Sequence, residues 1–272
     1  MIIDGVRQVY HVAGQGPVCV AHPGGPGLDW SYLRSPGLEE HFTMVYPAPV
    51  GTGGSGPVAD YHLATYVRFL AGLIDGLGED QVHLLGHSHG GFVTQQYALA
   101  HQERVAGLTL YSTSPYAGPD FWADGMRRLA AYPARHPDVP EAAEVPAAFQ
   151  RALAARDDET ITREFATALP VYFADFWSRR DAYEPFRAAV RMATAPATAP
   201  DPVVFDVRER LGELKVPTVV IAGRHDFLCA PGWTALLADG IPGAEVRWLE
   251  GSGHFGHVEQ PEEFTEAVLT LR

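Results

Sequence analysis

A serine flanked by two glycines is the feature of this sequence that most directly indicates chemistry. The pentapeptide Gly86-His87-Ser88-His89-Gly90 follows the apolar run Val82–Leu85 and precedes a helix-like stretch, Phe92–Ala100. A sharp strand-to-helix turn exposes a serine hydroxyl, and it needs glycines on both sides because a Cβ there would collide with neighbouring backbone. The pattern therefore predicts a nucleophilic serine at position 88.

A serine hydroxyl is a weak nucleophile at neutral pH, so it needs a basic partner and a carboxylate that orients that partner. Asp226 follows the apolar run Thr218–Ala222, at the carboxyl end of an expected parallel strand, where open α/β sheets collect functional groups. His254 lies in a glycine-flanked loop after the next such run, Glu245–Leu249. We predict that Ser88 is the nucleophile, His254 the base and Asp226 the orienting acid.

Other residues compete for two of these roles. His257 lies three residues beyond His254 and is the weaker candidate for the base, because it falls where the next helix is approached. Asp201 and Asp206 are weaker candidates for the acid, because they precede the strand that Asp226 follows.

The alternation of strand and helix patterns predicts an α/β fold, with a mostly parallel central sheet covered by helices on both faces. The expected strands are Val6–Val12, Val18–Ala21, Phe42–Tyr46, Val82–Leu85, Val105–Tyr111, Thr218–Ala222 and Glu245–Leu249. The clearest expected helices are Tyr61–Leu77, Gly91–Ala100, Pro231–Leu237 and Pro261–Leu271. We expect the early strands to form an antiparallel edge.

The alternation stops between Ser114 and about Asp206. Pro- and Ala-rich helical text takes its place, with expected helices at Gly125–Ala131, Ala147–Ala155 and Ile161–Leu169, and a hinge or exit loop at Pro196–Pro202. We interpret residues 114–206 as a helical cap inserted into a core made of residues 1–113 and 207–272. Its many aromatic residues suit either a small cap core or a substrate pocket. The candidates for the pocket are Trp122, Tyr172, Phe176 and Trp177.

Taken together, these motifs resemble the α/β-hydrolase family, in its proline iminopeptidase-like branch. The chain order Ser88, Asp226, His254 is that of α/β-hydrolases, and it differs from the order in chymotrypsin and subtilisin. The segment His22-Pro23-Gly24-Gly25-Pro26-Gly27 is similar to the H-G-G-P-G segment of that branch. This resemblance implies that the amides of Gly25 and His89 form an oxyanion hole.

Two departures from that branch leave the substrate open. Pro23 occupies the position of the branch's histidine, with His22 one place earlier. The cap also lacks a Trp-x-x-Trp-Glu segment, whose acidic residue helps those enzymes bind a free amino terminus. The nearest text, residues 176–181, places two arginines before its carboxylate.

We therefore expect a cofactor-independent serine hydrolase that acts on an ester, lactone or amide of a small substrate. The alternatives are release of N-terminal proline from a short peptide, and a hydrolase-like module that binds a ligand without turnover.

Composition narrows the possible partners. The chain of 272 residues has a formal net charge of −13, which disfavours nucleic acid and anionic membranes because both attract basic surfaces. No run approaches the ~20 apolar residues of a membrane span and no basic leader is evident, so we expect a cytoplasmic protein.

Two further patterns suggest no cofactor or metal. Cys19 and Cys229 are far apart in apolar settings, which is typical of buried free thiols. The segment Gly51-Thr52-Gly53-Gly54-Ser55-Gly56 matches G-x-G-x-x-G, the dinucleotide fingerprint. The residues after it do not open a helix directly, as pyrophosphate binding requires.

Overall fold

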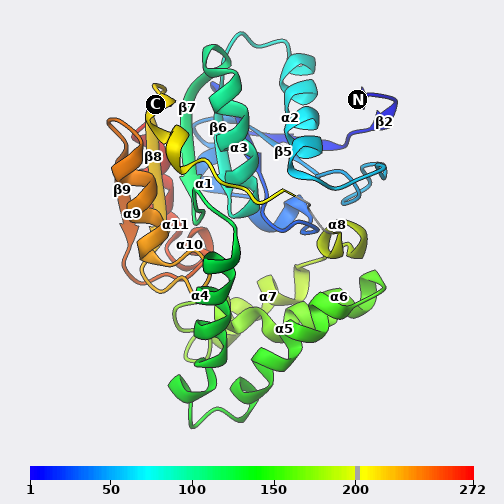
Figure 1. The fold of residues 1–272 in the computed structure, drawn as a ribbon, viewed down its shortest axis with the longest axis vertical. Helices are drawn as coiled ribbons and strands as arrows, with labels where there is room; N and C mark the ends of the chain where they lie inside the picture. The colour runs from blue at the N-terminus through cyan, green and yellow to red at the C-terminus, as the bar shows by residue number, and fades with distance from the viewer. Residues whose placement is uncertain (200–202) are drawn as a thin grey trace.

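A seven-stranded sheet forms the centre of the molecule in the computed structural model, which describes residues 1–199 and 203–272 (Figure 1). The strand order is β3-β5-β4-β6-β7-β8-β9, and two short strands, β1 (Ile2–Ile3) and β2 (Val6–Arg7), pair separately. The strands of the large sheet are β3 (Tyr10–Ala13), β4 (Val18–His22), β5 (Thr43–Pro47), β6 (Val82–His87), β7 (Val105–Tyr111), β8 (Thr218–Gly223) and β9 (Glu245–Leu249).

All neighbouring strands of this sheet run parallel except β3, which is antiparallel to β5. The prediction of an antiparallel early edge was therefore right for β3 only, because β4 pairs in parallel with both β5 and β6. The expected strand Val6–Val12 is also split, into β2 and β3. Its two parts belong to different sheets, which the apolar pattern alone does not reveal.

Helices cover both faces of the sheet, and alternate residues along the strands serve the two faces. Their bounds are α1 (Pro36–Glu39), α2 (Leu63–Leu77), α3 (His89–Ala100), α9 (Pro231–Gly240), α10 (Gly256–Glu259) and α11 (Pro261–Leu269). On β8, Val220 packs in the cluster with α2, α3 and α9, whereas Val219 and Ile221 pack in the other cluster with α1 and α11. The central strands are thus buried on both faces.

A helical insertion lies between β7 and β8 and forms the lower half of the molecule in Figure 1. Its helices are α4 (Pro119–Ala130), α5 (Val145–Ala154), α6 (Asp158–Ala168), α7 (Arg180–Ala189) and α8 (Thr194–Thr198). The two chain segments that join it to the core lie side by side, since Tyr116 and Asp206 form an antiparallel bridge. Part of the expected hinge Pro196–Pro202 is helical in α8, and residues 200–202 lie outside the described residues. The domain boundaries at 114 and 206 stay a prediction.

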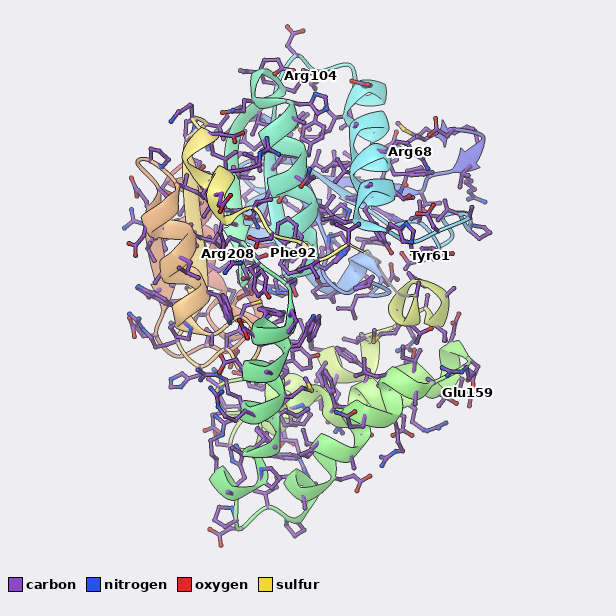
Figure 2. The ribbon with its side chains drawn as sticks, in the orientation of Figure 1. Tyr61, Arg68, Phe92, Arg104, Glu159 and Arg208 are labelled. Atoms are coloured by element: carbon purple, nitrogen blue, oxygen red, sulfur yellow. The ribbon has the colours of Figure 1, made fainter. Side chains whose placement is uncertain are left out.

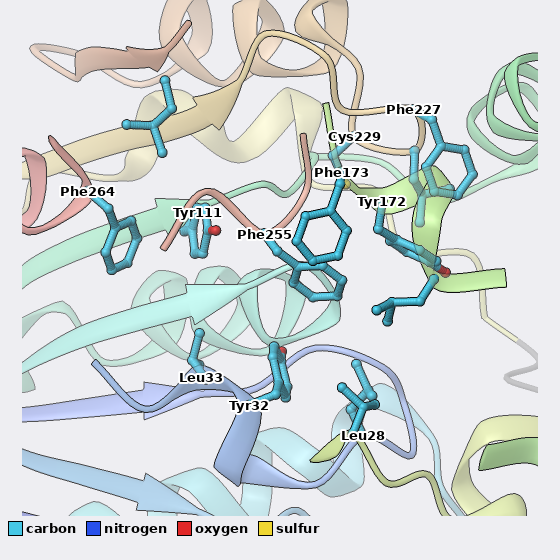
Figure 3. Packing of buried hydrophobic residues seen from close by; sticks show 14 of the residues in the cluster. Leu28, Tyr32, Leu33, Tyr111, Tyr172, Phe173, Phe227, Cys229, Phe255 and Phe264 are labelled. Carbon is cyan, nitrogen blue, oxygen red and sulfur yellow. The ribbon is translucent and has the colours of Figure 1, made fainter. Parts of the chain in front are cut away.

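The core continues from the sheet into the insertion without a break. Figure 3 shows Tyr172 and Phe173 of the insertion beside Phe255 of the core, with Tyr32 below them. The rings of Tyr172 and Phe173 lie 5.5 Å and 5.6 Å from that of Phe255. The insertion is therefore fixed to the core by aromatic packing.

Two expectations from composition can be compared with the fold. Cys19 and Cys229 are both buried and free. Within the described ranges, no helix has the length and apolar character needed to cross a membrane.

Candidate active site

Ser88 occupies a strained turn between β6 and α3. Its backbone has φ 54° and ψ −119°, a conformation that is rare for a residue with a side chain. The neighbouring backbone explains the flanking glycines: a Cβ on Gly86 would lie 2.2 Å from Thr94 Oγ1, and one on Gly90 would lie 2.2 Å from the His22 carbonyl oxygen. The G-x-S-x-G spacing thus reflects close approach of the backbone around Ser88.

His254 and Asp226 form a buried pair at the carboxyl ends of β8 and β9. His254 Nδ1 lies 2.7 Å from Asp226 Oδ2, and Asp226 Oδ1 accepts hydrogen bonds of 2.9 Å from the amides of Leu228 and Cys229. Because Nδ1 faces a carboxylate, it carries the ring proton, which leaves Nε2 as the basic nitrogen. Ser88 and His254 line the same cavity, so the structure brings the three expected residues to one place.

The glycine-rich turn after β4 passes directly against the serine. A Cβ on Gly24 would lie 2.9 Å from Ser88 Cβ, so only glycine allows this approach. Gly25 lines the cavity, and its amide donates no hydrogen bond to any other described residue. His89 is the first residue of α3, immediately after Ser88. Both amides expected to hold an oxyanion therefore belong to segments that touch the nucleophile.

Tyr32 and His87 link this turn to the histidine loop, and sequence reasoning missed both. The Gly24 amide donates to Tyr32 Oη at 2.6 Å, Tyr32 Oη lies 2.7 Å from His87 Nδ1, and His87 Nε2 lies 3.0 Å from the His254 carbonyl oxygen. A carbonyl only accepts, so His87 carries its proton on Nε2 and accepts from Tyr32 at Nδ1. Position 87 was visible inside the pentapeptide, but its partner lies 55 residues away in sequence.

His257, the weaker candidate for the base, has both ring nitrogens engaged elsewhere. Its Nε2 donates to the Tyr32 carbonyl oxygen at 2.8 Å, and its Nδ1 lies 3.0 Å from Tyr111 Oη. Of the weaker candidates for the acid, Asp206 forms an ion pair with Arg208, and Asp201 lies outside the described residues. These contacts favour the original assignments.

Glu259 is a second group that the sequence did not single out. Its two carboxylate oxygens accept the amides of Gly253 and Ala174, each at 2.7 Å. The first belongs to the histidine loop and the second to the insertion, so one buried carboxylate joins the two. Burial raises the pKa of Glu259 to about 7.

The cavity beside Ser88 has a volume of about 130 Å³ and is lined mostly by apolar side chains. Trp122 and Tyr172, two of the expected pocket residues, line it. Phe176 and Trp177 do not, which corrects that expectation. Phe176 is buried against Phe173 inside the insertion, and Trp177 faces a separate surface pocket. The sequence pattern alone could not distinguish the aromatic residues that face this cavity from those that do not.

Two features could have suggested a metal or cofactor. Ligand atoms of Asp226, Cys229 and His254 lie within 4.8 Å of one another, but burial raises the pKa of the Cys229 thiol well above its usual range. The thiol thus keeps its proton and is a poor ligand. The segment at residues 51–56 leads into α2 only at Leu63, so no helix begins directly after its glycines.

Comparison with known proteins fits this geometry. The family model for the alpha/beta hydrolase fold matches residues 17–261. The chain belongs to the α/β-hydrolase family. The predicted fold class is therefore confirmed, whereas membership of the proline iminopeptidase branch is not shown by these matches.

Relatives of this α/β-hydrolase include enzymes of several kinds. The 2-hydroxy-6-oxononadienedioate/2-hydroxy-6-oxononatrienedioate hydrolase 1 of Dechloromonas aromatica is 28% identical over 96% of this chain and 88% of that protein. The 2-hydroxymuconate semialdehyde hydrolase of a Pseudomonas species is 26% identical over 98% of this chain and 91% of that protein. An esterase from Exiguobacterium antarcticum shares the fold, with a TM-score of 0.72 at 20% identity over 99% of this chain and 96% of that one.

The contacts of Tyr32 predict the effect of Tyr32→Phe on this α/β-hydrolase. The change leaves the Gly24 amide without an acceptor and His87 Nδ1 without a donor, and such buried groups cost about 1–3 kcal/mol. We expect the free energy of unfolding to fall by about 2 kcal/mol. We also expect Ser88 to react about tenfold more slowly with a fluorophosphonate probe, because the turn that holds Gly25 is loosened.

Tyr66→Phe is the matched control. Tyr66 is also buried near the site, but its Oη has no hydrogen-bond partner among the described residues. Its removal should change the free energy of unfolding by less than about 0.5 kcal/mol. Equal effects of the two substitutions would contradict a positioning role for the Tyr32 hydroxyl.

The buried histidines predict that acid destabilises this α/β-hydrolase. Burial lowers the pKa of His22 and His257 from 6.5 to about 4, and lowers that of His87 well below 6.5. Between these values the unfolded chain binds more protons than the folded one, so the free energy of unfolding falls as the pH falls from 6.5 to 4. Glu259 acts in the opposite direction between its ordinary value of 4.5 and about 7.

The three fully buried histidines against one carboxyl give a net uptake of about two protons on unfolding near pH 5.5, or about 3 kcal/mol per pH unit. Partial burial also lowers the pKa of His83 and His136, which acts in the same direction. Urea unfolding measured at several pH values between 5 and 7 tests this slope. Glu259→Gln should make it steeper by about one proton, since the opposing group is gone. A free energy of unfolding that does not change over this range would show that the histidines titrate normally.

Proposed function

We propose that this α/β-hydrolase cleaves esters or lactones of small apolar carboxylic acids through an acyl-serine intermediate. The observation that carries the proposal is the chemistry of the cavity shared by Ser88 and His254. Among the described residues, no Asp, Glu, Lys or Arg lines it. A charged substrate group would lose its hydration there without gaining a partner, so an uncharged substrate suits the cavity best.

The proposed reaction uses the atoms named above. Ser88 Oγ attacks the acyl carbon while His254 Nε2 takes its proton, and Asp226 holds the imidazole in the required tautomer. The amides of Gly25 and His89 stabilise the oxyanion. Collapse of this intermediate expels the alcohol, which receives the proton from His254. Water then attacks the acyl-serine with His254 again as base, and the acid leaves as Ser88 regains its proton.

Hydrolysis of a carbon–carbon bond is the second candidate. Two relatives that align with nearly the whole chain are named for 2-hydroxy-6-oxononadienedioate and 2-hydroxymuconate semialdehyde, and hydrolysis of such compounds breaks a carbon–carbon bond. The Dechloromonas aromatica enzyme is named for a dioate, which is a dicarboxylate. A site for two carboxylates requires cationic groups, and the described lining of this cavity offers none. This chemistry therefore suits the chain less well than ester cleavage.

Release of N-terminal proline has less support. That activity requires a carboxylate to hold the substrate's ammonium group. Asp226 is already committed to His254 and two amides, and Asp181 is exposed at the start of α7, outside the cavity lining. The cavity thus lacks the electrostatic partner that an aminopeptidase needs.

A substrate panel tests these alternatives. Initial rates would be compared on p-nitrophenyl acetate and butanoate, proline p-nitroanilide with a free or acylated amine, and a 2-hydroxy-6-oxo-dienoate. We expect the esters to be the best substrates. Preference for the free-amine prolyl substrate, or for the dienoate, would replace the ester proposal. Ligand binding without any turnover would instead indicate a binding module.

We expect Ser88→Ala and Asp226→Asn to lower kcat for ester hydrolysis by different amounts. Loss of the nucleophile should lower kcat by on the order of 10⁴ or more, and the amide should lower it by on the order of 10³–10⁴ by favouring the wrong tautomer. Ser112→Ala is the matched control, since Ser112 Oγ is also buried but has no partner among the described residues. Wild-type rates in Ser88→Ala would reject the mechanism.

A further inference from the structure

Two cavities of contrasting character are lined in part by residues of the insertion. The inner one, about 130 Å³, contains Ser88 and is mostly apolar. The outer one is a cleft of about 860 Å³ between the glycine-rich loop at residues 51–55 and the outer faces of α6 and α7, with charged side chains such as Arg163 and Glu159. Figure 2 shows Glu159 at the N-terminal end of α6. Of the residues that the structure describes, Met192 alone lines both.

Helix α6 forms much of the wall between them. Its residues Ile161 and Phe165 face the inner cavity, whereas Thr162 and Ala166, each about 100° further around the helix, face the outer cleft. The turn that carries Gly25 completes the wall, because Leu28 and Met192 form an antiparallel bridge. Met192 therefore lies where the helix and the turn meet.

The backbone of Met192 is held independently of its side chain. Its amide donates a 3.0 Å hydrogen bond to Thr162 Oγ1. The two flanking residues bond to the turn: the Arg191 carbonyl accepts from the Asp29 amide at 3.1 Å, and the Ala193 amide donates to the Gly27 carbonyl at 2.8 Å. None of these contacts involves the thioether chain. A substitution at position 192 can thus change the barrier between the two cavities and leave the backbone of the wall in place.

The volume of the inner cavity limits what it can hold. A cavity of about 150 Å³ lined by apolar side chains accommodates benzene, so this one accommodates an acyl group of about six carbon atoms. A methionine chain is unbranched and flexible, and it fills irregular gaps between better-fixed neighbours. A longer acyl chain would need the space that the Met192 side chain occupies.

We propose that Met192 closes the acyl end of the cavity and restricts this enzyme to acyl groups of about six carbons or fewer. This inference rests on the proposed ester hydrolysis and adds the residue that sets acyl length. Removing the side chain should open a passage from the inner cavity into the outer cleft, where the end of a longer chain would lie.

Chain-length profiles of wild type, Met192→Ala and Met192→Leu test the proposal. With p-nitrophenyl butanoate, hexanoate and decanoate, wild type should lose kcat/KM sharply beyond hexanoate. Met192→Ala should raise the decanoate-to-butanoate ratio of kcat/KM by about tenfold or more, because additional methylene groups become buried. The volume-matched Met192→Leu should keep the wild-type ratio. An unchanged ratio in a Met192→Ala protein with a normal melting temperature would overturn the proposal.

A second substitution distinguishes an opened passage from general loosening. Ala166 lines only the outer cleft, so Ala166→Trp in the Met192→Ala background should block the passage and restore the preference for butanoate. A ratio that stays high in the double variant would contradict passage into that cleft. A series of alkyl butanoates serves as the comparison. If Met192→Ala changes only that series, the cavity end holds the alcohol and the acyl assignment is wrong.

A binding measurement keeps the two proposals separable. In the Ser88→Ala background, calorimetric titration of 1-butanol and 1-octanol requires no turnover. Met192→Ala should strengthen octanol binding relative to butanol even if the wild type hydrolyses no ester. Absence of Ser88-dependent ester hydrolysis would reject the proposed function. An octanol-to-butanol affinity ratio that Met192→Ala leaves unchanged would instead reject the role of Met192 as the barrier.

Discussion

The site depends on the close approach of three backbone segments around Ser88. Gly86 lies against Thr94, Gly90 against the carbonyl of His22, and Gly24 against Ser88 itself. Positive φ at a serine costs about 1–3 kcal/mol, so the turn persists only because β6, α3 and the loop after β4 are packed on all sides. The same proximity that strains the serine also brings the Gly25 and His89 segments to it.

A network of buried polar groups lies beneath this strained turn. Tyr32, His87, His257 and Tyr111 connect the turn after β4 with the carbonyl of His254, and each ring nitrogen in the network faces a partner. Figure 3 shows Tyr32 and Tyr111 on either side of the end of β6, the strand that leads to Ser88. Neutral histidines serve this purpose because each combines one donor with one acceptor in a small rigid ring. In surroundings of low dielectric constant such a network is rigid only while every member is satisfied.

The insertion contributes more than a cover. Its backbone bonds to both loops of the site, through the His254 amide to the Tyr172 carbonyl at 2.6 Å and the Ala193 amide to the Gly27 carbonyl at 2.8 Å. Trp122 and Leu153 are 47% and 54% exposed and also line the cavity, so α4 and α5 form its apolar mouth. The residues that line the cavity and those expected to perform chemistry are therefore held by one continuous set of contacts.

Much of this protein could be predicted from local sequence. The serine turn, the candidate acid after β8 and the candidate base after β9 were each predicted from a few adjacent residues, because strand, turn and helix signals act over short distances. The parallel sheet and the helical insertion follow from the same alternation. The direction of the early strands was the exception, because an apolar run does not indicate whether its strand is parallel or antiparallel. In the structure β4 is parallel to both β5 and β6.

Only the tertiary structure decided which side chains meet across long sequence separations. Tyr32 and His87 are 55 residues apart, and Glu259 reaches an amide 85 residues away. It also decided which aromatic residues of the insertion face Ser88, placing Tyr172 in the cavity and Phe176 outside it. The physical reason is that a short motif fixes the conformation of its own backbone, whereas contacts between distant segments depend on how whole helices and loops pack.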